Sequence, residues 1–439
     1  MVAVQVLNSS LFRQTIHEQR VVFCHYIIVW MLSFYLLADI ASGFFVLQLG
    51  IDLKISLLYK MVLFVCLLLM IARYQFNVFI VLLSIITLLL VSPVAELFRL
   101  PVAEYFIADF SAVIKILMPL TVFMYFASVY QVNSVFVEKW LKFALFSNFT
   151  ILLVNLAVGA LGFGRPSYAL ANDETAGSNG YIYAANELGA TLIVLFGFVL
   201  HMFWNHYRKY YIVMAVLTLL CGVLVATKTA MLAAILLIFL VPLFNERQVF
   251  FRLTWLKIKL LVPATILVIT LIIFIVDFLK GLGLYDRMMW ILSQKGIIGV
   301  IWSGRNEFSA ELLNIYVYQS TLFQQVFGQG GGGVAEHVGI KYSAEVDAVD
   351  TLVWFGFMGL LICLAMPFYF IGRAAKIFLN TDSLYAPCVL LVNLILLFLS
   401  QLSGHVWMSG TLGISLGLLN ALLLLENTKS IEYKERLSA

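Results

Sequence analysis

Charged residues are scarce in this chain: Asp, Glu, Lys and Arg make up 11% of its 439 residues, whereas 63% of the residues are hydrophobic. A soluble globular protein carries about 25% charged and about 45–50% apolar residues. The scarcity of charge therefore excludes a soluble enzyme, and the high hydrophobicity excludes an intrinsically disordered chain. The formal net charge is only +4, so no nucleic-acid partner is expected.

The sequence also lacks the motifs of several enzyme classes. It contains no HExxH, CxxC or G-x-S-x-G pattern, so metalloprotease, redox and serine-hydrolase activities have no motif to support them. Its five cysteines stand singly within apolar runs. This spacing predicts small buried side chains, and neither a disulfide framework nor a zinc site. We expect no metal and no cofactor.

Long apolar runs account for most of the chain. A membrane-spanning helix needs about 20 apolar residues, because the hydrocarbon core is about 30 Å thick. By that measure the sequence predicts a single transmembrane domain over residues 1–439, an all-α polytopic integral membrane protein with about twelve spans. The predicted spans are Val21–Phe45, Ile55–Ala72, Val78–Val94, Phe106–Tyr130, Phe143–Leu161, Ile182–Trp204, Ile212–Ala226, Met231–Phe244, Ile258–Phe278, Leu352–Ile371, Leu384–Leu402 and Val406–Leu425.

The distribution of basic residues predicts the orientation. Short cytoplasmic loops are enriched in Lys and Arg, and every predicted loop on the N-terminal side of the membrane contains at least one. Both termini are therefore expected in the cytoplasm. The first span is too long for a signal peptide, so it is expected to be a retained anchor. The two spans that flank Lys228 are short, and a broken or re-entrant hairpin is an alternative there.

Two connections on the outer side are unusually long, residues 162–181 and residues 280–350. Loops of more than about 12–15 residues are usually functional or disordered. The second segment contains an amphipathic stretch, Glu307–Phe323, in which apolar residues recur at near-helical spacing. We expect a helix there that lies at the membrane interface or caps a cavity.

Ionisable residues in or beside the membrane are the best candidates for a site, because an unpaired ion at the bilayer centre costs at least about 2.5–3.5 kcal/mol. The ionisable candidates on the outer side are Arg165, Glu187, Lys228, Arg305, His337, Glu345, Asp347 and Asp350, and the polar Asn186 beside Glu187 is added to them. Simpler alternatives exist for many of them. Arginine and histidine are common in exposed loops, and carboxylates are favoured in the first turn of a helix. The glycine run Phe327–Gly333 is either a hinge or a nest of N–H groups for an anion.

Several of these features together resemble the Wzy-type polysaccharide polymerases, which are related to the O-antigen ligases. The features are the number of spans, the outer arginines Arg165 and Arg305, and the segments GYIYAANELG, TKTA and EVDAVDTLVWFGFMG. The resemblance covers the chain from about Arg165 to Gly359. It implies a GT-C-like glycosyltransferase of the bacterial inner membrane that acts at the periplasmic face.

Such an enzyme transfers a growing glycan from undecaprenyl diphosphate to a second lipid-linked repeat unit, and so makes O-antigen, capsule or exopolysaccharide. Its implied partners are this donor and acceptor, the lipid bilayer and a chain-length regulator protein. Catalytic roles are expected for Arg165 and Arg305, which would hold the diphosphate, and for His337, which would accept a proton, with Glu345 or Asp347 as its substitute. The residues expected to bind substrate are Lys228, Asn186, Glu187, Glu345, Asp347 and Asp350.

Two other functions fit parts of the sequence. An O-antigen ligase uses the same donor but passes the glycan to the lipid A core. A transporter or flippase of lipid-linked oligosaccharides would carry charges in mid-span, and Asp109 and Lys115 in the fourth predicted span favour it. Asp109 and Lys115 do not face each other squarely on one helix, and Asp39 is expected to be similarly isolated.

Overall fold

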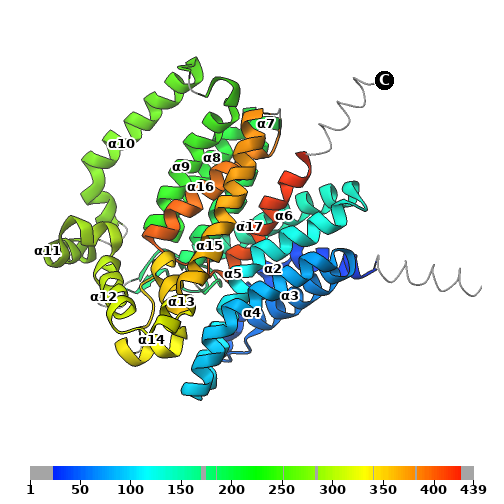
Figure 1. Ribbon diagram of the computed structural model, residues 1–439. Helices are drawn as coiled ribbons and strands as arrows, with labels where there is room; N and C mark the ends of the chain where they lie inside the picture. Colours follow the sequence, from blue (N-terminus) through cyan, green and yellow to red (C-terminus); the bar gives the residue numbers. More distant parts are fainter. Residues whose placement is uncertain are drawn as a thin grey trace, which may run out of the picture.

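The computed structural model describes residues 23–169, 175–183, 185–250, 252–281, 285–339, 341–380 and 383–426. This part of the chain is almost entirely helical (Figure 1). Its regular extended structure is limited to one ladder, in which β1 (Tyr168–Ala169) pairs antiparallel with β2 (Thr175–Ala176). The expected all-α class is confirmed.

The helices follow the predicted apolar runs. They are Phe23–Ser33, α2 (Tyr35–Leu49), α3 (Ile55–Tyr74), α4 (Phe76–Arg99), α5 (Ala103–Tyr130), α6 (Ser134–Ala160), α7 (Ala185–His206), α8 (Tyr211–Val225), α9 (Lys228–Asn245), α10 (Trp255–Gly281), α11 (Tyr285–Trp302), α12 (Arg305–Tyr318), α13 (Leu322–Phe327), α14 (Gly330–Val338), α15 (Asp347–Asn380), α16 (Ala386–Leu402) and α17 (Gly410–Ala421). Short 3-10 turns, η2 (Arg208–Tyr210), η3 (Arg247–Val249) and η4 (Leu422–Leu424), extend or link them.

Eight helices in the described residues are long and apolar enough to cross a membrane. A ninth is added if Phe23–Ser33 and α2, which meet at a bend of 54°, form one broken span. The predicted span Val21–Phe45 therefore corresponds, within the described residues, to two helices that meet at a bend. Two shorter apolar helices, Ala386–Leu402 and Gly410–Leu424, occupy the last two predicted spans. The architecture is that of a polytopic membrane protein, and the count of twelve stays a prediction.

The short spans around Lys228 form a complete helical hairpin. Arg208–Val225 and Lys228–Asn245 each reach 18 residues. Between them Ala226 adopts a left-handed conformation, with φ of 57°. Thr227 then caps α9, because its Oγ1 accepts a hydrogen bond from the Ala230 amide at 3.2 Å. By length and composition each helix can span a bilayer, so a re-entrant segment is not needed here.

Three helices form the centre of the bundle. Only 22% of the apolar stretch of α4 is buried. By contrast, 83% of the apolar stretch of α7 and 72% of that of α5 are buried. Helix α17 packs against both of them. The contact with α5 is close, because Gly413 and Gly417 stand where any side chain would meet Met118 or Val122. Small residues allow such close approach between helices in membranes.

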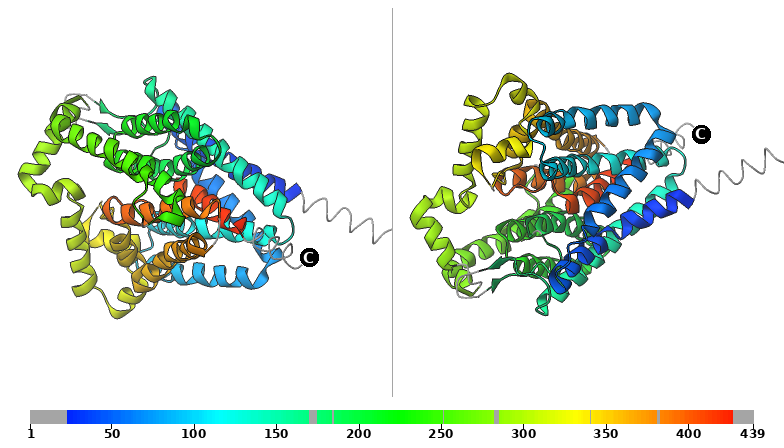
Figure 2. Two further views of the ribbon diagram at one scale, coloured as in Figure 1. Left: turned by 90° about the horizontal axis from the view of Figure 1, so that it is seen from above. Right: turned by 90° about the horizontal axis from the view of Figure 1, so that it is seen from below.

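The long segment 280–350, expected as a loop, is mostly helical. It contains α11 to α14, which lie at one end of the bundle, while α10 runs apart from the bundle along its side (Figures 1 and 2). The expected amphipathic helix is present as α12, which buries Leu312 and Ile315 in a small core with Val334 and Val353. It ends at Tyr318, earlier than expected, and a capping box at Thr321 starts α13.

Candidate functional site

The segments predicted on the outer side converge around a cavity of about 630 Å³. We call it the cationic cavity. Its polar and charged lining comes from six separate segments of the chain and comprises Ser167, Tyr168, Asn186, Thr227, Lys228, Thr229, Ser303, Arg305, Lys341, Glu345, Ser403 and His405. Four of the nine predicted site residues are thus brought together: Asn186, Lys228, Arg305 and Glu345. Three fixed cations face a single carboxylate here, which suits a ligand that carries more than one negative charge.

Arg305 is placed by a tight turn. Ser303 and Gly304 both have positive φ, 58° and 81°, and the second position suits glycine because it has no Cβ. Arg305 then begins α12, and its Nε and Nη2 both donate to Oε2 of Glu345, at 3.1 and 2.6 Å. Its Nη1 donates to the carbonyl of Leu402 at 3.4 Å. The guanidinium is therefore held in one orientation by two different segments.

Glu345 lies in the connection before α15, in a left-handed conformation with φ of 58°. Although burial opposes its ionisation, the hydrogen-bonded guanidinium of Arg305 holds the pKa of Glu345 below its usual value of 4.5. Lys341 and His405 add to this effect, each with a nitrogen 3.9 Å from a Glu345 carboxylate oxygen. Glu345 is therefore ionised at neutral pH and links three basic side chains around the cavity.

Lys228 reaches the same cavity from the first turn of α9. Its Nζ donates to Oγ of Ser303 at 3.0 Å and also to the carbonyl of Val300. Both acceptors are uncharged, and they lie in α11 and in the turn that presents Arg305. This contact brings the α9 end of the bundle to the α11–α12 turn.

Asp347 and Asp350 are buried behind the residues that line the cavity. Oδ2 of Asp347 accepts hydrogen bonds from the amides of Val406 and Trp407, at 2.9 and 3.0 Å. Asp350 accepts from the Ala344 amide at 2.6 Å and from Oγ of Ser343 at 2.8 Å. Both carboxylates are buried and neither lines the cavity. They act on the site by positioning the loops that carry Glu345 and His405.

Arg165 lies beside the cavity and is not part of its lining. Its guanidinium stacks on the ring of Tyr183, 4.2 Å from the ring centroid. Its amide donates to the carbonyl of Gly180 at 2.7 Å and so closes the base of the β1–β2 hairpin. The next residues of that hairpin, Ser167 and Tyr168, do reach the cavity. Arg165 therefore does not line the cavity together with Arg305.

His337 is exposed on α14 and does not line the cavity. The glycine run that precedes it is part of a packed helix. The Gly331 amide donates to both carboxylate oxygens of Asp109, at 3.1 and 3.0 Å, and a Cβ at Gly331 would lie 2.8 Å from one of these oxygens. The protein's own carboxylate therefore occupies the place where a bound anion was considered.

Two basic side chains of the lining were not among the candidates from the sequence: Lys341 and His405. His405 lies in the short connection between α16 and α17, with φ of 58°, and Glu345 packs closely against the preceding Gly404. The sequence does place His405 in an outer turn, SGHVW. Its predicted position, on the same side of the membrane as Arg305, is the feature of the sequence that indicates His405 as a site residue.

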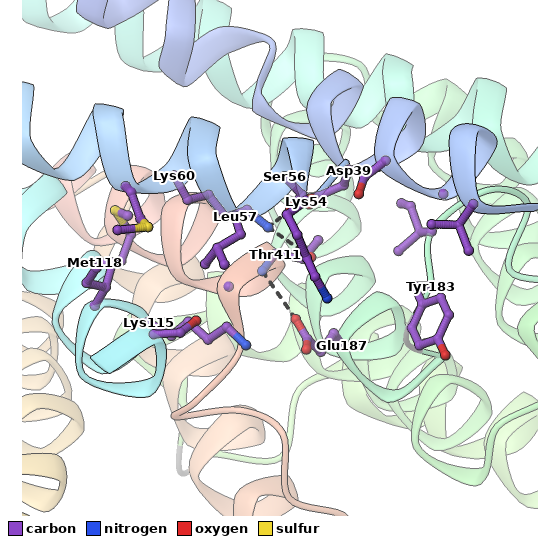
Figure 3. A pocket seen from close by; sticks show the side chains of 18 of the residues that line it. Asp39, Lys54, Ser56, Leu57, Lys60, Lys115, Met118, Tyr183, Glu187 and Thr411 are labelled. Carbon is purple, nitrogen blue, oxygen red and sulfur yellow. Dashed lines mark hydrogen bonds and ion pairs between the residues drawn. The ribbon is translucent and has the colours of Figure 1, made fainter. Parts of the chain in front are cut away.

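Glu187 faces a second cavity, of about 480 Å³ (Figure 3). We call it the mixed-charge cavity, since Asp39, Lys60, Lys115 and Glu187 all line it. Asp39 is paired with Lys60, with Oδ1 and Nζ 2.6 Å apart, so the expectation that Asp39 is isolated is wrong. Consecutive residues of α7, Asn186 and Glu187, therefore line two different cavities.

Comparisons with family models, curated proteins and solved structures found no match to this chain. Within the described residues, no cluster of three or more His, Cys, Asp or Glu side chains is suited to a metal ion. The arrangement of the cationic cavity is therefore the principal guide to function.

Proposed function

We propose that the protein is a membrane glycosyltransferase, a polysaccharide polymerase that acts on undecaprenyl-diphosphate-linked glycans at the periplasmic face of the bacterial inner membrane. The observation that carries the proposal is the convergence of Lys228, Arg305 and Lys341 on one cavity at the end of an apolar bundle. The lipid tail of such a donor needs a protein embedded in the membrane. Its diphosphate head needs a cationic pocket near the membrane surface.

The cavity supplies two elements of such a transfer. The planar fork of Arg305 suits phosphate oxygens, and fixed cations stabilise the charge that develops on the departing diphosphate. His405, beside Glu345 in the same cavity, is the general base that we assign in place of His337. The acceptor hydroxyl oxygen bonds to the anomeric carbon, the bond from that carbon to the diphosphate oxygen breaks, and the hydroxyl proton passes to His405.

The direct test uses purified full-length protein, reconstituted in lipid with the lipid-linked repeat unit as sole substrate. Formation of longer lipid-linked oligomers is expected. We expect Arg305→Ala to slow the reaction by about 10²–10³-fold, typical for loss of one charge-stabilising group, and Arg305→Lys to lie between Ala and the wild type because it keeps the charge without the fork. Full turnover by a well-folded Arg305→Ala protein would remove this residue from the mechanism.

A flippase of lipid-linked oligosaccharides is the second candidate, and the mixed-charge cavity favours it. Asp39 and Lys60 are ionisable residues within helices of the bundle, and each is only 7% exposed. Buried ionisable residues of this kind often mark transport pathways. The same reconstitution separates the two functions: a flippase would move the repeat unit across the bilayer without lengthening it, whereas a polymerase lengthens it.

A further inference from the structure

The mixed-charge cavity alternates groups of opposite sign around one space. The carboxylates Asp39 and Glu187 and the ammonium groups Lys60 and Lys115 come from α2, α7, α3 and α5 (Figure 3). The formal charges of these four residues cancel, as do those of the two other charged lining residues, Asp52 and Lys54, whose side chains are paired 2.7 Å apart. The cavity is therefore a poor trap for a free anion or a free cation, in contrast to the cationic cavity beside it.

Hydrogen-bond donors and acceptors lie next to one another in the lining of the cavity. Lys60 Nζ donates to Asp39, and lies 3.5 Å from Oγ1 of Thr411. Glu187 Oε2 accepts from Oγ of Ser409 at 2.8 Å and from the Thr411 amide at 3.3 Å. Figure 3 shows Lys115 approaching this group from the side of α5. Lys115 interacts electrostatically with Glu187 but donates no hydrogen bond within the described part of the chain, so its N–H groups are open to a ligand in the cavity.

The start of α17 leaves room for the two lysines. A Cβ at Gly410 would lie 3.4 Å from Lys60 Nζ and 3.4 Å from Lys115 Cε. The absence of a side chain at this position lets both lysine side chains approach the helix N-terminus. The space that remains is lined by the hydroxyls of Ser42, Ser56, Ser111 and Thr411.

Stability alone does not explain this cluster. Replacing a buried ion pair by apolar residues of similar volume is often neutral or stabilising, whereas burying ions is expensive. Oδ2 of Asp39 is buried without a hydrogen-bond partner among the described residues, which adds to the cost. Ionisable groups kept inside a membrane bundle at this expense are good candidates for a binding function.

The chemistry of the lining favours a neutral compound that is rich in hydroxyl groups. Each hydroxyl both donates and accepts hydrogen bonds, which alternating ammonium and carboxylate groups satisfy. At the mouth, the Tyr183 ring is 62% exposed and braced by Arg165. The face of such a ring is apolar and can pack against the C–H groups of a sugar, and the tyrosine hydroxyl can form hydrogen bonds at the ring edge.

We propose that the mixed-charge cavity binds the terminal sugar of the acceptor glycan through Asp39, Lys60, Lys115 and Glu187, next to the cationic cavity that holds the donor diphosphate. This inference rests on the proposed function, because it assigns the second substrate of that transfer. The wall between the two cavities is the N-terminal turn of α7, where Asn186 and Glu187 face opposite substrates.

The test measures binding of two probes to the full-length protein in lipid nanodiscs. One probe is the repeat-unit oligosaccharide of the producing cell, released from its lipid by mild acid, and the other is farnesyl diphosphate. We expect Lys115→Gln and Thr411→Val to weaken oligosaccharide binding by about tenfold or more, as loss of a hydrogen bond to a charged group does, and to leave farnesyl diphosphate binding within about twofold. Arg305→Gln should show the reverse pattern. Lys142→Gln, on α6 and in the lining of neither cavity, should change neither.

The outcomes separate the two proposals. If the oligosaccharide binds equally well to the wild type, Lys115→Gln and Thr411→Val, the mixed-charge cavity is not its site. Binding of farnesyl diphosphate without any binding of the oligosaccharide would also overturn this inference and leave the donor site standing. Failure of the wild type to bind farnesyl diphosphate, with the oligosaccharide still bound, would instead contradict the proposed function.

Discussion

At the residue scale, the cationic cavity depends on a few side chains held by backbone constraints. Ser303, Glu345 and His405 all adopt positive φ, a conformation that non-glycine residues rarely take and that persists only when the surroundings enforce it. Here the surrounding hydrogen bonds of Arg305 and Asp347 supply the constraint. The strained positions cluster at the cavity, which is typical of functional sites.

The two histidines of the outer end provide a matched pair of variants. His405→Gln is expected to lower the turnover rate by about 10²–10⁴-fold, because it removes the general base that we assign. His337→Gln is expected to have no effect, because His337 is exposed on α14 outside the cavity. Initial rates of oligomer formation at saturating substrate measure both. A slow His337 variant with a normal His405 variant would reverse the assignment.

The Arg305–Glu345 pair has a defined pH dependence. Since the folded protein lowers the pKa of Glu345 below its usual 4.5, the stabilisation is present above that value and is lost as the pH falls through the folded-state pKa. The pair is partly exposed, so its contribution is at most about 1 kcal/mol. The thermal midpoints of the wild type and Glu345→Gln should differ both at about pH 8 and at about pH 5.5, and should converge only in stronger acid. A difference that vanishes near pH 7 would contradict the assigned cause.

At the element scale, α14 shows how a helix of glycines is stabilised from outside. Glycine is a poor helix former, yet Gly330–Val338 is helical. The carboxylate of Asp109 caps its first turn, and α4 and α5 leave no space for larger side chains. This arrangement attaches the outer helices to the bundle. It also gives a structural role to Asp109 inside α5, a charge that the sequence alone suggested as a sign of transport.

This packing predicts the effect of enlarging one glycine. Gly331→Leu should destabilise the protein by about 1–3 kcal/mol, because the new side chain must displace Asp109. Gly372→Ala on α15 is the control: a Cβ there meets nothing within 4 Å, and alanine favours the helix by about 0.5–1 kcal/mol. Thermal unfolding in detergent measures both changes. Equal midpoints for the two variants would show that α14 does not pack on α5 as described.

At the scale of the whole molecule, the two cavities lie at the end of the bundle where segments far apart in sequence meet. Lys228 joins α9 to α11 and to the turn after it, and Arg305 joins α12 to the end of α16 through the Leu402 carbonyl. The β1–β2 hairpin joins the α8 end through the Ser178 amide and the Leu224 carbonyl, 2.8 Å apart. The proposed orientation puts this end outside the cytoplasm.

Site-directed labelling tests that orientation. In a cysteine-free background, Lys54→Cys and Lys341→Cys should react fully with a membrane-impermeant maleimide in spheroplasts, since both side chains are exposed at the proposed outer end. Arg208→Cys and Lys376→Cys lie at the predicted cytoplasmic end and should react only after permeabilisation. The opposite pattern would invert the topology and place the site in the cytoplasm, which contradicts the proposed function.

Apolar run length by itself determined the helical class and the position of most helices, because a helix satisfies its own backbone hydrogen bonds and needs only a local stretch of apolar residues. It also marked Lys228, Arg305 and Glu345, since charges are conspicuous in such a sequence. The tertiary structure alone decided that Arg165 and His337 stand outside the cavity, that His405 lies inside it, and that Asp39 meets Lys60. Those outcomes depend on which helices become neighbours and on loop backbones with positive φ, and neither is encoded by spacing along the chain.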